Sequence, residues 1–126
     1  MPKKALEALT ESMFYVLMAL RSSPMCGTDI SHRVTALTDG RLQMGPATLY
    51  TILGKFEAEG YIAETAVEGR KRTYRITDAG QAAYSAELQR LHRCIHDAAR
   101  SDRTTEESYE REQEPVRVSP APLPVL

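Results

Sequence analysis

The chain has 126 residues, a formal net charge of −1, 42% hydrophobic residues and 26% charged residues, a composition typical of one soluble globular domain. No apolar run approaches the roughly 20 residues that a membrane helix needs, and no secretory leader is readable at the N-terminus. Two cysteines, Cys26 and Cys94, are too few for a disulfide framework or a zinc finger. A cytoplasmic protein without membrane contact is therefore expected.

The charge is unevenly distributed along the chain. Residues 1–100 contain 13 Lys and Arg against 11 Asp and Glu, whereas residues 101–126 contain three Arg and six acids. The C-terminal segment also closes on a proline-spaced run, Ser119 to Pro124, and has little apolar area to offset its ordering entropy. We predict that residues 101–126 form an acidic, Pro-containing, disordered tail.

Two helical segments are predicted in the N-terminal third of the chain. The first has Thr10 as its cap and repeats apolar residues at helical spacing: Leu9, Met13, Val16, Leu17 and Leu20. The turn Ser22-Ser23-Pro24 follows it. The second begins near Gly27, ends at Asp39-Gly40, and places three apolar residues at i, i+4 and i+7: Ile30, Val34 and Leu37.

The third helical segment carries the clearest boundary signals. Gly45 stands at the N-cap, Pro46 at the first helical position, and Gly60 just after the last turn. Its apolar stripe consists of Leu49, Ile52, Leu53 and Phe56. Because this stripe must face the core, the face left for solvent consists of Thr48, Tyr50, Thr51 and Lys55.

A strand pair and a last helix follow. Residues 61–65 and 72–76 are predicted to form a hairpin that turns at Glu68-Gly69, and its tip and return strand carry four cations: Arg70, Lys71, Arg72 and Arg75. Thr77-Asp78 caps the last helix. In that helix a narrow apolar seam recurs at +4, +3 and +4: Tyr84, Leu88, Leu91 and Ile95. Such a seam is typical of a helix that pairs with a partner helix.

This order of elements describes a mainly helical α+β fold with a small hairpin, the winged helix-turn-helix. We expect a DNA-binding domain over residues 1–80 and a C-terminal dimerisation helix over residues 81–100. In this fold the third helix enters the major groove of duplex DNA, where hydroxyls and Lys suit phosphates and base edges. The predicted DNA contacts are Thr48, Tyr50, Thr51, Lys55, Arg70, Lys71 and Arg72.

The stretches GRLQMGPATLYTILGKFEAEGYI (residues 40–62) and GRKRTYRITDAG (residues 69–80) resemble the PadR family of bacterial transcriptional regulators. The resemblance implies a repressor that dimerises through its final helix with help from the first, has no cofactor, and responds to a small hydrophobic or aromatic effector. It assigns Tyr50 to a phosphate contact and the wing cations to DNA. The chain departs from the family at Cys26-Gly27-Thr28-Asp29, where an aromatic-Gly-aromatic-Glu entry to the second helix is usual.

Several alternatives remain beside this interpretation. Tyr50 could pack in the core, and the wing cations could be solvated charge. His92, Cys94 and His96 invite a metal site, but the i, i+2, i+4 spacing turns Cys94 away and supplies no third ligand. Cys26 and Cys94 lack the CxxC spacing of a thiol switch. Met13, Phe14 and Leu17 with Leu88 and Leu91 could line an effector cavity, although core and dimer contacts are the simpler explanation.

No arrangement of residues typical of an enzyme is present, since the sequence has neither a Gly-rich phosphate loop nor a nucleophile–His–acid set. The rival to a DNA-binding repressor is a winged-helix module for protein–protein contact. A dimeric regulator would recognise a pseudo-palindromic operator with half-sites about 34–36 Å apart.

Overall fold

The computed structural model describes the chain from residue 8 to residue 112, with side chains described through residue 104. Its elements in chain order are α1 (Glu11–Leu20), β1 (Met25–Cys26), α2 (Gly27–Leu37), α3 (Pro46–Glu59), β2 (Ile62–Glu68), β3 (Lys71–Ile76) and α4 (Asp78–Glu112). The predicted order of helices and hairpin is confirmed, and the fold is a mainly helical winged helix-turn-helix. Within residues 8–112, none of the helices combines the length and apolarity needed to cross a membrane.

The helix boundaries follow local capping chemistry. The Thr10 hydroxyl accepts a hydrogen bond from the Met13 backbone N–H at 3.2 Å and so caps α1, as predicted. Gly45 and Pro46 begin α3, and Gly60 ends it in the left-handed conformation, with φ at 77°. A side chain would be strained at that φ, which explains why a glycine follows the helix.

The core lies where the three N-terminal helices meet. All four stripe residues of α3 are buried, as are Val16, Leu17 and Leu20 of α1. From α2 the core receives Ile30 and Val34. The prediction was wrong for Leu37, the last residue of α2, which is 38% exposed.

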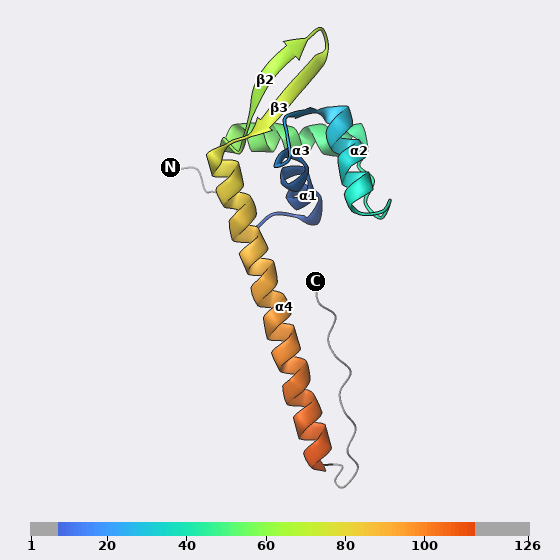
Figure 1. Ribbon diagram of the computed structural model, residues 1–126, viewed down its shortest axis with the longest axis vertical. Coiled ribbons are helices and arrows are strands. Elements are labelled where there is room, and N and C mark those ends of the chain that lie inside the picture. Colours follow the sequence, from blue (N-terminus) through green and yellow to red (C-terminus); the bar gives the residue numbers. More distant parts are fainter. Residues whose placement is uncertain (1–7, 113–126) are drawn as a thin grey trace. The chain divides into compact units, whose positions relative to one another are not determined.

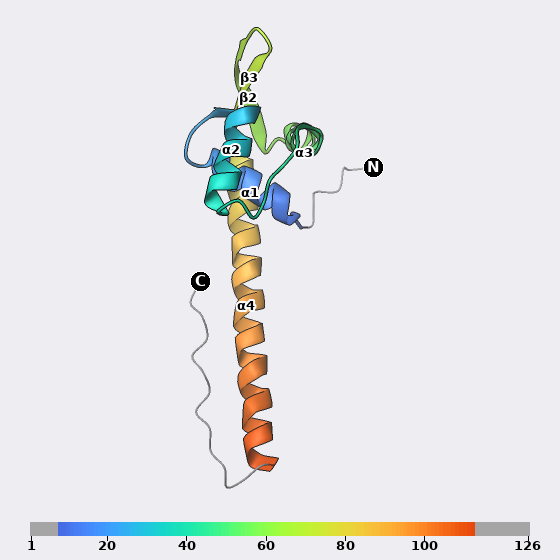
Figure 2. The ribbon, with the colours of Figure 1, turned by 90° about the vertical axis from the view of Figure 1, so that its right-hand side faces the viewer.

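The sheet has three strands rather than the predicted two. β2 and β3 pair antiparallel with Gly69, at φ 62°, in the turn between them, and the short β1 adds to the other edge of β3 through Met25↔Tyr74 and Cys26↔Thr73. A bulge interrupts the β2–β3 register between Glu64 and Ala66. Figure 1 shows the hairpin extending away from α1, α2 and α3, and Figure 2, which looks nearly along the axis of α3, shows the same.

The hairpin tip and the hairpin base differ in burial. At the base, Ile62 and Tyr74 belong to the core, whereas every side chain from residue 64 to residue 72 is exposed. Tyr74 is therefore the last inward-facing anchor before the strands leave the body of the domain. Its burial, followed by the nearby Glu57 carboxylate, raises the pKa of the Tyr74 phenol above its usual value.

Helix α4 begins as predicted and ends later. The Thr77 hydroxyl accepts from the Gly80 N–H at 3.1 Å and donates to the Gly60 carbonyl at 2.6 Å, which ties the start of α4 to the end of α3. The prediction that helix gives way to a disordered tail at residue 101 was wrong for residues 101–112, because α4 continues to Glu112. A polar, charged composition suits a solvated helix as well as disorder. Residues 113–126, the rest of the predicted tail, lie outside the described residues.

The chain divides into two compact units, the first ending at Glu87 and the second beginning at Leu88. The first unit therefore contains the three N-terminal helices, the sheet and the first turns of α4.

Candidate nucleic-acid interface

The outward face of α3 carries the four polar side chains that the sequence predicted. Because Leu49, Ile52, Leu53 and Phe56 point into the core, Thr48, Tyr50, Thr51 and Lys55 are all exposed. The first turn of α3 adds backbone donors to this face, since no side chain caps the N-terminus at Gly45. Hydroxyls, one ammonium group and uncapped N–H groups form a surface rich in hydrogen-bond donors.

The four side chains do not form a single cluster. Thr48, Thr51 and Lys55, spaced i, i+3 and i+7, lie on the side of α3 that faces α1. Tyr50 lies about 200° around the helix from Thr48, on the side that faces α2. The α3 face thus has an α1 side and an α2 side.

On the α2 side, Tyr50 lies over the start of α2. Its hydroxyl is so close to Gly27 that a Cβ placed on this glycine would lie 2.7 Å from Tyr50 Oη. Gly27 is the first residue of α2, and no side chain caps that helix at Cys26. Tyr50 is nevertheless 55% exposed, whereas Gly27 is buried and the first turn of α2 also carries the acidic Asp29.

The role of Gly27 was missed at the level of sequence. The signal was present, because Gly27 is the residue of the family entry motif that this chain keeps while its neighbours differ. A glycine at the first position of a helix is unfavourable by propensity. Here it provides the space that the Tyr50 ring needs.

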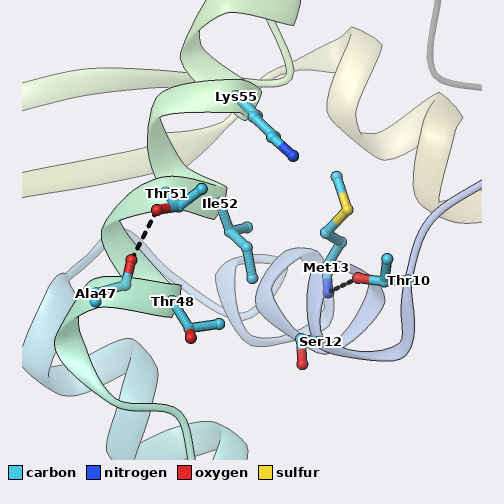
Figure 3. A pocket seen from close by; sticks show the side chains of 8 residues that line it. All are labelled: Thr10, Ser12, Met13, Ala47, Thr48, Thr51, Ile52 and Lys55. Atoms are coloured by element: carbon cyan, nitrogen blue, oxygen red, sulfur yellow. Dashed lines mark hydrogen bonds between the residues drawn. The ribbon is translucent and has the colours of Figure 1, made fainter.

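On the α1 side, a groove of about 410 Å³ separates α3 from the first turn of α1 (Figure 3). Its lining consists of Thr10, Ser12, Met13, Ala47, Thr48, Thr51, Ile52 and Lys55. This groove could not be predicted from the sequence, because α1 and α3 are far apart along the chain and only packing brings their polar residues together.

The wing holds the three predicted cations at and beyond its turn. Arg70 and Lys71 are exposed, and neither forms an ion pair within residues 8–104. Arg72 lies on the same face of β3 as Tyr74 and reaches the Glu64 carboxylate at 3.5 Å. Arg75 lies on the opposite face of β3, as Lys71 does, and is also exposed.

One of the four predicted seam residues on α4, Tyr84, packs inside its own chain. It is buried in the first unit, where its ring stacks on Phe14 with a centroid separation of 4.9 Å and the Arg21 guanidinium lies 4.4 Å from its centroid. Tyr84 is therefore a core residue of its own chain, which corrects its assignment to the dimer seam. A +4 spacing to Leu88 cannot distinguish these two roles.

The other three seam residues leave apolar surface uncovered in this chain. Leu88 and Leu91 are half-buried, and Ile95 is 43% exposed. Nearby, Cys94 is exposed and accepts from Arg90 at 3.8 Å, whereas Cys26 is buried. Across the described part of the chain, no three His, Cys, Asp or Glu side chains are grouped to hold a metal ion.

Comparison with known proteins identifies relatives of this fold. Residues 16–86 match the model of the family described as the transcriptional regulator PadR-like family. The sequence has no significant match among curated proteins.

Three solved structures illustrate the likeness. A transcriptional regulator from Clostridium thermocellum is 26% identical, with a TM-score of 0.63 over 70% of this chain and 89% of that one. A PadR-like transcription factor from Bacteroides fragilis is 19% identical, with a TM-score of 0.58 over 71% and 87%. Bordetella bronchiseptica BpsR, whose DNA binding is regulated by 6-hydroxynicotinic acid, is 20% identical, with a TM-score of 0.57 over 71% and 64%.

Proposed function

Because the chain belongs to the transcriptional regulator PadR-like family, we propose that it is a homodimeric, sequence-specific DNA-binding repressor that a small molecule releases from its operator. A place in a family of transcriptional regulators also supports the expectation that the chain is not an enzyme. The observation that carries the proposal is the donor-rich face of α3, whose four polar side chains are all exposed while its apolar stripe is fully used in the core.

In this proposal α3 enters the major groove of the operator. Thr48, Thr51 and Lys55 contact base edges and phosphates. Tyr50 donates its hydroxyl to a phosphate. The contact with Gly27 supports this role, because it fixes the position of a Tyr50 side chain that is 55% exposed.

The wing supplies the flanking contacts. Arg70 and Lys71 have no competing ion pair within residues 8–104 and reach phosphates or a narrow minor groove directly. Arg72 joins them by leaving Glu64, since an exposed ion pair of this kind contributes only about 0–1 kcal/mol. Arg75 adds a fourth cation on the Lys71 face.

Dimerisation through α4 completes the site. Leu88, Leu91 and Ile95 leave an apolar strip that a second copy would cover. A two-fold dimer presents two copies of α3, and the operator would then be pseudo-palindromic with half-sites about 34–36 Å apart.

Release by a small molecule is supported by BpsR, whose DNA binding is regulated by 6-hydroxynicotinic acid. The expected effector is a small hydrophobic or aromatic compound. Repression would follow from occupancy of a promoter by the dimer.

The test is selection of tight-binding fragments from a random duplex library, followed by fluorescence anisotropy of the selected duplex at several salt concentrations. We expect a pseudo-palindromic site and a steep loss of affinity with salt, about 0.9 log unit per log unit of salt for each phosphate neutralised. If no sequence shows salt-sensitive binding, the protein is not a DNA-binding repressor, and the protein–protein module becomes the better interpretation.

A further inference from the structure

The groove between α1 and α3 has a lining suited to one kind of molecule. Lys55 is its single charged side chain, and no acid lies among the lining residues. Four hydroxyl residues come from both helices, and three apolar residues, Met13, Ala47 and Ile52, complete the lining. A groove of about 410 Å³ lies within the range of roughly 300–1,000 Å³ that holds small ligands.

The hydroxyl groups of the groove differ in whether their protons are already donated. Thr10 Oγ1 already accepts from the Met13 N–H at 3.2 Å, so its own O–H remains to be donated. Ser12 and Thr48 form no side-chain hydrogen bond within residues 8–104. Thr51, by contrast, donates to the Ala47 carbonyl at 2.8 Å. The Lys55 ammonium is the one charged donor of the lining, and it matches a carboxylate better than a neutral or cationic group.

The apolar part of the lining further limits the chemical class of the ligand. Figure 3 shows Lys55 at one end of the groove, Ser12 and Thr48 toward the other, and the side chains of Met13 and Ile52 between them. The apolar groups are aliphatic or thioether, and the lining contains no aromatic ring on which a ligand ring could stack. This apolar surface suits an aliphatic ligand body, which needs no ring to stack on.

We propose that this groove binds a small aliphatic carboxylate, with the carboxylate at Lys55 and the hydrocarbon body against Met13 and Ile52. The consequence for regulation rests on the proposed function. Thr48, Thr51 and Lys55 belong both to the groove and to the proposed DNA surface, so a bound carboxylate covers atoms that the operator needs. DNA and carboxylate then exclude each other by direct overlap.

Binding is tested first on the full-length protein without DNA. Octanoate, kept below its micelle concentration, is titrated while amide ¹H–¹⁵N shifts are recorded. Octanamide serves as the neutral analogue and inorganic phosphate as the anion without an apolar body. We expect octanoate to shift the amides of Ser12, Thr48 and Lys55, and octanamide to bind at least about tenfold more weakly because its contact with Lys55 lacks charge assistance.

Variants of Ser12 separate the charge effect from misfolding. Ser12→Glu places a carboxylate in the first turn of α1, where the helix dipole favours it, so the fold is retained while octanoate is repelled. Ser12→Gln has the same size without the charge. We expect Ser12→Glu to weaken octanoate binding more than Ser12→Gln does, an electrostatic difference that fades at high salt.

Three results would overturn the proposal: shifts centred away from the groove, octanamide as tight as octanoate, or phosphate as tight as octanoate, which would reveal an unspecific anion site. A competition experiment then addresses regulation. Octanoate should raise the apparent Kd of wild type for its selected duplex, and Ser12→Glu should lose that effect. Carboxylate binding without any salt-sensitive DNA binding would refute the proposed function but not the groove, whereas DNA binding that is indifferent to groove-bound octanoate would refute direct exclusion.

Discussion

Replacing Gly27 with alanine should move the Tyr50 ring without unfolding the protein. The added methyl group would lie 2.7 Å from Tyr50 Oη, closer than real Cβ contacts come, and 3.0 Å from Cζ, which is a tight contact. The obstacle is the far end of a side chain that is 55% exposed. The ring can therefore swing toward solvent, whereas a backbone obstacle could not yield.

The magnitudes favour a selective loss of DNA binding. Alanine is favoured over glycine by up to about 1 kcal/mol in a helix interior and by less at the first helical position, and displacing the ring from its rotamer costs about 0.5–1.5 kcal/mol. These two effects oppose each other, so the free energy of unfolding of Gly27→Ala should fall by no more than about 1.5 kcal/mol. A hydrogen bond to a charged phosphate contributes about 1.5–3 kcal/mol, and its loss weakens DNA binding at least about tenfold for each half-site.

The assay combines urea denaturation with anisotropy on the selected duplex, for Gly27→Ala, Tyr50→Phe and the double variant. Each single variant should bind DNA more weakly. The double variant should resemble Tyr50→Phe alone, because the alanine acts only through the hydroxyl. Wild-type affinity in a folded Gly27→Ala protein, or fully additive losses in the double variant, would refute the reasoning.

Three further predictions concern stability and assembly. Gly80→Ala would place a Cβ 2.1 Å from a backbone carbonyl oxygen and should lower the free energy of unfolding by about 1–3 kcal/mol in urea denaturation. The control Gly54→Ala meets nothing within 4 Å and should raise the free energy of unfolding by up to about 1 kcal/mol. Equal effects of the two variants would contradict the packing at Gly80. Leu91→Asp should yield monomers in sedimentation, because it places an unpaired charge in the proposed seam. The control Gln89→Asp, at an exposed position, should leave the assembly unchanged. A dimer that survives both changes does not use this seam. The pKa of the Tyr74 phenol is raised above its ordinary value of 10.0 in the folded protein. The neutral phenol therefore contributes its full stability below pH 10.0, and this contribution is lost as the pH rises through the folded pKa. Tyr74→Phe should reduce this alkaline loss of stability in melting curves, and an unchanged pH profile would argue against Tyr74 as its source.

The helices of the core could be predicted because local and tertiary signals agree there. In α3 the Gly45-Pro46 start, the four-residue stripe and the Gly60 stop all indicate the same helix. The same reasoning failed for Leu37, because the last turn of α2 passes beyond the core and periodicity alone does not reveal where a neighbour ends. The prediction for Tyr84 was wrong in the opposite sense: this residue is buried in its own chain, because its contacts with Phe14 and Arg21 depend on packing between residues distant in sequence.

Short or solvated elements were the hardest to predict. β1 consists of two residues, Met25 and Cys26, and exists because β3 offers a free edge; no period can be read from two residues. The end of α4 was missed because charged residues that form no core can still be helical. For the candidate site, the residue types on α3 and the wing were predictable, whereas the groove against α1 and the contact of Tyr50 with Gly27 required the packed structure.

The exposed tip of the hairpin separates stability from recognition. Since side chains 64–72 bury nothing in the core, most substitutions there should change the free energy of unfolding by no more than about 0.5 kcal/mol. The side chains of the tip can therefore change without altering the stability of the domain that carries them. Related regulators could then come to prefer different DNA sequences beside their operators through substitutions in the hairpin tip alone, without compensating substitutions in the helices.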